Sequence, residues 1–313
     1  MATLDIVKKF ESLLVDADNM LDSYFAEVSP IAIVDTANNA KFSCHMVRRD
    51  INGHNRVQAI AKMLSAKVVD YAIPRSKIKE ALEHKERNNS TDKLVLLEKE
   101  ARSLFTDIIN AGECGEILLY VFANSFLKLP QVLCKMPLKT SSQMHYHGVD
   151  GLHAHYDEKT KVLSLYWGES KIHASVSSAM SSCFESIAKM LIPDDSTGSA
   201  KDRDLKLFRD NPNLNDSILE QLVLSYLDPD NANNLLRKDC GICLIGYDEK
   251  AYEKTTEDEI KKELEKQIAT RKASLKTYIA NSKLQCYEMH VFLIPFPSAD
   301  SFREAFLKEV GGA

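Results

Sequence analysis

The period of hydrophobic and polar positions along the chain separates expected helices from expected strands. Apolar residues three or four apart predict helices after residue 90, at 91–110, 112–128, 174–191, 214–227 and 257–282. The closing segment SADSFREAFLKEV predicts one more. Short apolar runs such as CGICLIGYD and LQCYEMHVFLIPFP predict buried strands. Strands separated by helices in this order are typical of an α/β/α domain with a mixed sheet.

The first 90 residues mix helical and extended patterns. SPIAIVDTA and FSCHMVRRDI predict strands, whereas NRVQAIAKMLSAKVVDYAI has helical spacing. The polar run from Glu83 to Lys93 is typical of a boundary between subdomains. We therefore expect an N-terminal α+β extension over residues 1–90, a candidate docking region for a partner, followed by an α/β domain over 91–313. Within that domain, the charged segment 194–204 predicts a surface loop.

Composition narrows the class of protein. Hydrophobic residues make up 44% of the chain and charged residues 27%, as in ordinary globular proteins. The net charge of −5 argues against a uniformly basic surface. A local basic groove for nucleic acid remains compatible with that charge. The seven scattered cysteines indicate reduced thiols, and Cys240 and Cys243 are expected to be buried strand residues. No signal peptide or membrane-spanning run is evident, so we expect a soluble, cytoplasmic protein.

The strand after residue 160 carries two opposite charges at the end of an apolar row. Alternate residues of a strand share a face, so Leu165, Trp167, Glu169 and Lys171 are expected on one side. Ionised groups on a buried face are costly unless they are paired or bound to a metal. A structural Glu–Lys pair at the exposed end of the strand is the ordinary interpretation of this pattern.

Asp150 suggests a different interpretation. If the hairpin is symmetric about a turn near Asp157 to Thr160, Asp150 lies close to residues 167–169 and its carboxylate can meet that of Glu169. Two carboxylates form an oxygen-rich site suited to Mg²⁺ or Mn²⁺, which the backbone carbonyl of Ser170 could complete.

Lys171 would place a cation beside that metal, where it could orient water or stabilise charge on phosphorus. An aspartate followed by E-x-K on the adjacent strand is the arrangement of PD-(D/E)xK nucleases, which have a restriction-endonuclease-like α/β/α core. A further acid often comes from the preceding helix, where Glu113 and Glu116 share a face.

Four motifs make the resemblance more specific. The segments GECGEILL, KMPLKT, HGVDGLH and GESK, within residues 112–175, resemble the HamA family, the nuclease subunit of the bacterial Hachiman anti-phage system. The resemblance implies a metal-dependent DNA nuclease that works with a HamB-like superfamily 2 helicase. It also implies that Asp150, Glu169 and Lys171 are catalytic, with Glu116 as the upstream acid and Glu113 as its competitor. Val149 stands where the motif's proline would be.

Basic and histidine residues near these motifs are candidates for binding nucleic acid. Lys135 and Lys139 could neutralise phosphates, although ordinary solvated lysines fit equally well. His147 and His153 flank the Gly-Val-Asp-Gly segment and are further candidates for contacts to DNA. A zinc site is a weaker alternative for the histidines of this region, which are His145, His147, His153, His155 and His173.

Taken together, these patterns predict a Mg²⁺-dependent deoxyribonuclease controlled by a helicase. Two alternatives stay open. The same core could cut RNA or structured nucleic acid, because E-x-K chemistry acts on the phosphate. The chain could instead be a catalytically weak adaptor that binds the helicase. The patterns leave open whether one or two metals bind.

Overall fold

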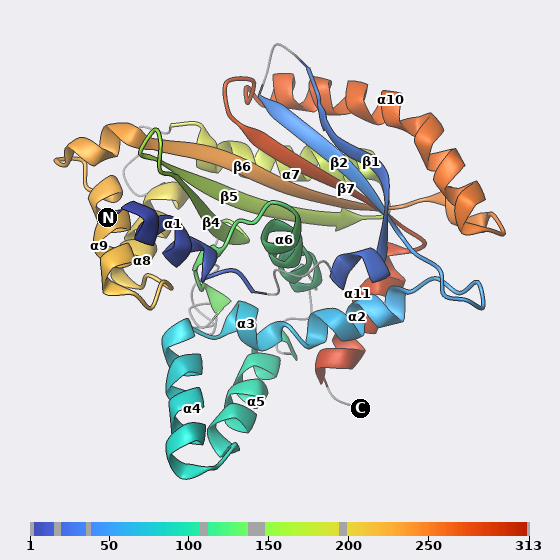
Figure 1. Ribbon diagram of the computed structural model, residues 1–313. Helices are drawn as coiled ribbons and strands as arrows, with labels where there is room; N and C mark the ends of the chain where they lie inside the picture. The colour runs from blue at the N-terminus through green and yellow to red at the C-terminus, as the bar shows by residue number, and fades with distance from the viewer. Residues whose placement is uncertain are drawn as a thin grey trace.

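A single mixed sheet runs through the protein. The structure is a computed structural model that describes residues 3–15, 20–35, 39–106, 112–136, 148–193 and 199–311. Within these residues the sheet has seven strands in the order β1-β2-β7-β6-β5-β4-β3 (Figure 1). The strands are β1 Phe25–Ile33, β2 Ala40–Val47, β3 Gln131–Leu133, β4 Gly151–Asp157, β5 Val162–His173, β6 Arg237–Asp248 and β7 Met289–Phe296. β2, β7, β6 and β5 run parallel, and the outer pairs are antiparallel.

Helices lie on both faces of this sheet, which confirms the predicted α/β class. The α-helices are α1 Thr3–Glu11, α2 Val57–Ser65, α3 Val68–Ala72, α4 Arg75–Asn88, α5 Asp92–Thr106, α6 Glu113–Phe126, α7 Val176–Leu191, α8 Ala200–Asp210, α9 Ser217–Leu227, α10 Glu257–Asn281 and α11 Ala299–Gly311. Short 3-10 helices are η1 Met20–Ser23, η3 Ala232–Leu236 and η4 Lys250–Glu253. α7 and α10 cover one face, and α6 packs on the other (Figure 1). Among the helices described, none has the length and apolarity needed to cross a bilayer.

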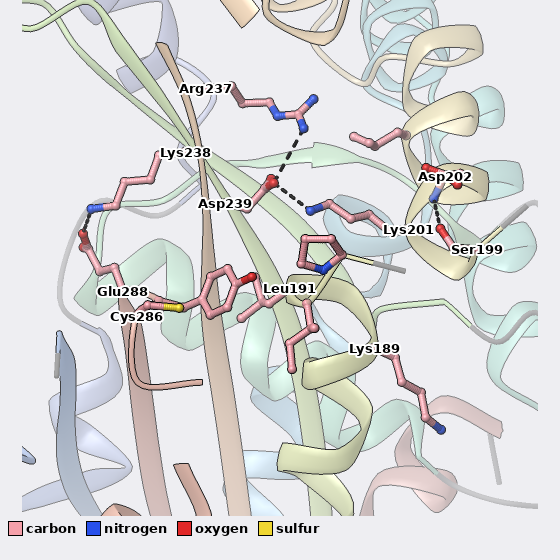
Figure 2. A pocket seen from close by; sticks show the side chains of 14 residues that line it. Lys189, Leu191, Ser199, Lys201, Asp202, Arg237, Lys238, Asp239, Cys286 and Glu288 are labelled. Carbon is pink, nitrogen blue, oxygen red and sulfur yellow. Dashed lines mark hydrogen bonds and ion pairs between the residues drawn. The ribbon is translucent and has the colours of Figure 1, made fainter. Parts of the chain in front are cut away.

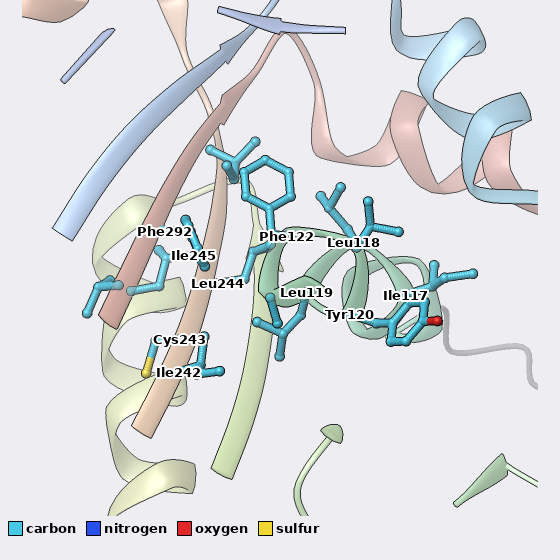
Figure 3. Close-up of a cluster of buried hydrophobic side chains, with 14 of the residues drawn as sticks. Ile117, Leu118, Leu119, Tyr120, Phe122, Ile242, Cys243, Leu244, Ile245 and Phe292 are labelled. Carbon is cyan, nitrogen blue, oxygen red and sulfur yellow. The ribbon is translucent and has the colours of Figure 1, made fainter. Parts of the chain in front are cut away.

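The core sits between α6 and the parallel strands. Every residue of β7 is buried, as expected of a parallel strand covered on both faces. α6 is buried nearly all round, as its apolar sequence predicts. Its Phe122 meets Phe292 of β7 edge to face, with ring centroids 5.1 Å apart, and its Leu119 lies close to β5 (Figure 3). This packing fixes the position of α6 over the sheet.

The predicted surface loop over 194–204 is wrong for its second half. Residues 199–204 begin α8, where the Ser199 hydroxyl caps the helix by accepting from the Asp202 amide at 3.1 Å. Asp204 is completely buried rather than exposed. The charged sequence around Asp204 is typical of an exposed loop, and Lys135, which pairs with Asp204, lies far from it in the chain. Residues 194–198 lie outside the described residues.

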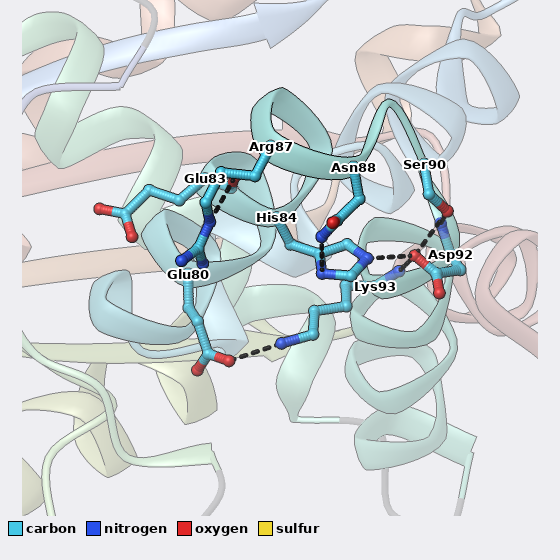
Figure 4. Close-up of polar contacts among 8 residues, drawn as sticks. All are labelled: Glu80, Glu83, His84, Arg87, Asn88, Ser90, Asp92 and Lys93. Atoms are coloured by element: carbon cyan, nitrogen blue, oxygen red, sulfur yellow. Dashed lines mark hydrogen bonds and ion pairs between the residues drawn. The ribbon is translucent and has the colours of Figure 1, made fainter.

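The first 90 residues contribute to the same sheet as the rest of the chain. β2 pairs in parallel with β7, from Ala40 opposite Met289 to Cys44 opposite Leu293. The polar run at Glu83 to Lys93 forms the tip of the α4–α5 helical hairpin (Figure 4). The sheet thus continues across the boundary expected near residue 90, and the docking role of residues 1–90 stays a prediction.

The α4–α5 hairpin projects from the body of the protein (Figure 1), and polar contacts join its two helices near the tip. His84 Nε2 lies 3.0 Å from Asp92 Oδ1, and Lys93 Nζ lies 2.6 Å from Glu80 Oε1 (Figure 4). Asn89 ends α4 in the left-handed conformation, with φ of 53°, which Asn tolerates better than most residues.

Candidate functional site

The β4–β5 hairpin brings Asp150 to Glu169. The strands pair from Asp157 opposite Val162 to Gly151 opposite Gly168, so the turn lies where the symmetric hairpin predicts. Asp150 continues this register, because its amide donates to the Gly168 carbonyl at 2.9 Å. The predicted closeness of Asp150 to residues 167–169 is therefore confirmed. Beyond Gly168, β5 runs on to His173 with β6 on one edge and Asp150 beside the other, while α6 packs on its face at Ser170 and Ile172.

Asp150 is held at this edge by Ser170. Its Oδ2 accepts hydrogen bonds from the Ser170 amide at 2.7 Å and from the Ser170 hydroxyl at 2.6 Å. The N–H and C=O of one strand residue point to the same side of the strand. The Ser170 carbonyl is therefore expected on the side where Asp150 lies, as a third oxygen beside the two carboxylates.

Glu169 and Lys171 lie on the face of β5 opposite the Ser170 side chain. They form an ion pair there, with Glu169 Oε1 2.5 Å from Lys171 Nζ. The Glu169 side chain is 5% exposed, whereas that of Lys171 is 30% exposed and reaches solvent. Burial, followed by the negative charge of Asp150, raises the pKa of Glu169 to about 8 despite the opposing effect of Lys171. Although burial lowers the pKa of Lys171, the charges of Glu169 and Asp150 outweigh it and raise that pKa above its ordinary value.

Two glycines allow α6 to approach the strand that carries these residues. A Cβ at Gly115 would lie 3.0 Å from Ser170 Oγ, and one at Gly168 would lie 3.0 Å from Leu119 Cδ2. Contacts this short mean that a side chain at either position would push α6 and β5 apart or shift their side chains. The close approach carries the buried Glu113 and Glu116 toward the site.

Tyr71 of α3 is a site residue that sequence patterns missed. Its hydroxyl donates to Glu116 Oε2 at 2.8 Å and lies 3.3 Å from the Asp150 carbonyl oxygen. A tyrosine in an apolar helical segment gives no sign of this role, which only the fold reveals. Arg303 of α11 was missed as well, and its Nη2 contacts the Ile172 carbonyl just past Lys171.

Two predicted DNA contacts lie inside the protein. Lys135 Nζ is 2.7 Å from Asp204 Oδ2, and this lysine side chain is 5% exposed. His153 is fully buried with its Nδ1 3.0 Å from the Leu129 carbonyl, and burial lowers its pKa to about 4, so its imidazole is neutral. Neither position fits a contact with a DNA phosphate, because neither side chain reaches the surface.

The other candidates in this group cannot be placed. Lys139 and His147 lie outside the described residues, as does His145. Of the histidines named for a zinc site, His153 is buried whereas His155 is exposed on the same strand.

The residues fit a divalent cation in their chemistry. Within the described ranges, no three His, Cys, Asp or Glu side chains converge into a ready metal site. Asp150, Glu169 and the Ser170 carbonyl are nevertheless an all-oxygen set, and Mg²⁺ binds through one or two carboxylates while keeping several waters. Burial and, after it, the negative charge of Asp150 raise the pKa of Glu169, and a bound cation would favour its ionised form.

A separate hollow of about 580 Å³ lies at the amino-terminal ends of β6 and β7 (Figure 2). Its charges pair with one another, with Lys201 2.7 Å from Asp239 and Lys238 2.6 Å from Glu288. It contains none of the predicted site residues. Asp239 is four residues before the strand neighbour of Glu169, about 13 Å along the sheet.

The fold and this site define a mixed α/β protein with two acidic residues and a lysine gathered at the end of a hairpin strand. The HamA family model matches residues 22–310, so the chain belongs to the HamA family. Membership gives it a role in Hachiman anti-phage defence, a system that works through a partner complex. A comparison with curated proteins gives no match.

Proposed function

We propose that the chain is a metal-dependent nuclease that hydrolyses DNA phosphodiester bonds as the effector of the Hachiman complex. The observation that carries this proposal is the register of β4 and β5. It brings Asp150 beside Gly168 and Ser170, the two neighbours of Glu169 in β5, and the Lys171 ammonium lies 2.5 Å from the Glu169 carboxylate. The arrangement resembles PD-(D/E)xK nucleases in its residue types and in their order on the hairpin.

Each residue has a distinct role in this proposal. Asp150, Glu169 and the Ser170 carbonyl would hold Mg²⁺ or Mn²⁺, which when bound polarises the phosphate and lowers the pKa of water. The Lys171 ammonium, partly exposed beside Glu169, orients the attacking water or stabilises charge developing on the phosphate. Glu116, fixed by Tyr71, supports the site from α6.

The helicase partner belongs to the proposal as well. A nonspecific nuclease free in the cell would damage host DNA, so we expect a HamB-like helicase to govern its access to DNA. Comparing DNA cutting by the isolated chain and by the complex, without a trigger, tests this control. Restraint requires faster cutting by the isolated chain.

Plasmid cleavage in Mg²⁺ and in EDTA tests the chemistry. Glu169→Ala and Lys171→Ala should each abolish metal-dependent cutting, measured with and without the helicase. Glu288→Ala and Lys238→Ala remove a matched pair, 2.6 Å apart at the other end of the sheet, and should cut like wild type.

The outcomes separate the candidate functions. Cutting that survives both Glu169→Ala and Lys171→Ala would reject this site. A parallel RNA substrate identifies a ribonuclease. No cutting by wild type under any condition, together with a stable helicase complex, would indicate an adaptor.

A further inference from the structure

A buried ion pair contacts Val149, the residue that precedes Asp150 in the chain. Lys135 follows β3 and Asp204 belongs to α8, and their charged atoms are 2.7 Å apart. Their side chains are 5% and 0% exposed. A buried ion pair is costly unless further hydrogen bonds satisfy its charged groups. The other hydrogen bonds of Lys135 and Asp204 therefore show which part of the chain the pair supports.

Both charges bind the backbone of Val149. Lys135 Nζ donates to the Val149 carbonyl at 2.7 Å, and the Val149 amide donates to Asp204 Oδ2 at 3.1 Å. The pair therefore fixes both polar backbone groups of the residue that precedes Asp150. Val149 is thereby bound to Lys135, 14 residues before it in the chain, and to Asp204, 55 residues after it.

Gly148 shows how tightly the pair encloses this backbone. A Cβ there would lie 2.5 Å from Lys135 Nζ and 2.7 Å from Asp204 Oδ1. A larger residue at this position would therefore have to displace the charged ends of Lys135 and Asp204.

Asp150 stands just before β4, whose first residue is Gly151. Its amide donates to the Gly168 carbonyl and its carboxylate accepts from Ser170. The backbone that leads into Asp150, at Val149, is held by Lys135 and Asp204, so the pair adds to the contacts that orient this carboxylate.

We propose that Lys135 and Asp204 are positioning residues for Asp150. They hold the Gly148–Val149 backbone so that the Asp150 carboxylate meets Ser170 beside Glu169. The pair is electrically neutral and buried, so it acts through Asp150 and not through contact with DNA. The effect on metal binding rests on the proposed nuclease function, whereas the effect on the backbone does not.

Three full-length variants test this role. Asp204→Asn keeps the shape of the side chain and removes its charge. The double variant K135M/D204L removes both charges, and buried pairs often tolerate replacement by apolar residues of similar size. Glu249→Gln is the matched control, because Glu249 pairs with Arg271 at 3.2 Å and its side chain is 8% exposed, away from β4.

Two measurements need no nuclease activity. Amide hydrogen exchange over residues 148–152 should be faster in Asp204→Asn and K135M/D204L than in wild type, and unchanged in Glu249→Gln. Calorimetric Mn²⁺ affinity should fall by about 10- to 100-fold in the first two variants, the usual effect of losing a group that orients a metal ligand. The Mg²⁺ concentration for half-maximal cleavage should rise by a similar factor.

The outcomes are distinct. Unchanged exchange at 148–152 in both charge variants overturns the proposal, as does faster exchange with unchanged Mn²⁺ affinity in a wild type that binds the metal. If the wild type neither binds Mn²⁺ nor cuts DNA, the nuclease function fails and the exchange result alone decides the positioning role. If Asp204→Asn does not fold, the double variant decides.

Discussion

The Tyr71 hydroxyl donates a hydrogen bond to Glu116 Oε2 at 2.8 Å. Through it α3, from the first 90 residues, reaches the candidate site on α6. The same hydroxyl lies 3.3 Å from the Asp150 carbonyl oxygen, so one buried side chain contacts two of the predicted catalytic residues. The N-terminal part of the chain thus helps to form the site.

Tyr71→Phe should lower both stability and cleavage. Losing a hydrogen bond to a carboxylate costs about 1.5–3 kcal/mol of unfolding free energy, and losing support for a site residue lowers cleavage by about tenfold. Urea unfolding and plasmid cleavage measure the two effects. Tyr252→Phe is the control, because the Tyr252 hydroxyl bonds to Val47 and Pro295 on β2 and β7. Equal loss of cleavage in both variants would contradict a specific role for Tyr71.

Gly115→Ala should destabilise the packing of α6 on β5. The added methyl group would lie 3.0 Å from Ser170 Oγ, and overpacking of this kind costs about 1–3 kcal/mol. Ser170→Ala removes that oxygen and also its hydrogen bond to Asp150, so Gly115→Ala should cost less in the S170A background than in wild type. Chemical denaturation of wild type, G115A, S170A and G115A/S170A measures the two costs, and equal costs in both backgrounds would argue against this contact as the cause.

The contribution of two buried histidines to the unfolding free energy should fall as pH falls from 6.5 to 4. His45 and His290 both contact the Ser43 hydroxyl, and burial lowers the pKa of each to about 4. The unfolded chain binds these protons below about pH 6.5 whereas the folded chain does not, so the contribution is complete above 6.5 and is lost toward 4. Each histidine accounts for about 3 kcal/mol over this range.

Comparing wild type with His290→Gln isolates this effect, because all other titrating groups are common to both. Urea unfolding at several pH values should give the variant a shallower decline in stability. Parallel declines would show that His290 is already protonated in the folded protein.

A chain limited to residues 91–313 should not fold stably. It would lack β1 and β2, leaving the edge of β7 from Met289 to Leu293 without its partner strand, and it would lack Tyr71 beside Glu116. Unpaired buried strand edges promote aggregation. Circular dichroism and size-exclusion chromatography against the full chain test this. A soluble fragment that unfolds cooperatively would instead support an independent domain.

The hairpin could be predicted because strand pairing follows from local sequence. Alternation along β5 placed Glu169 and Lys171 in one row, and the turn after Asp157 fixed the register that brings Asp150 opposite them. Each step depends on residues within about 20 positions of one another. The α/β class followed for the same reason, from the period of separate segments.

The supporting residues could not be predicted, because their partners are far apart in the chain. Lys135 has the same sequence appearance as a surface lysine, and its burial depends on Asp204, 69 residues later. Asp204 stands within the charged run KDRD, which is typical of an exposed segment. Tyr71 meets Glu116 45 residues on. The roles of Lys135, Asp204 and Tyr71 are set by tertiary packing, which the local sequence pattern does not predict.

β7 is the last strand in the chain, yet it lies between β2 and β6 in the sheet. During synthesis, β1 and β2 are made before β3 to β6, and they can be joined to β6 only after β7 has followed. The strands of the Asp150–Glu169 hairpin are complete long before that moment. A nascent chain therefore carries its proposed cutting residues on an unfinished sheet until β7 joins β2 to β6.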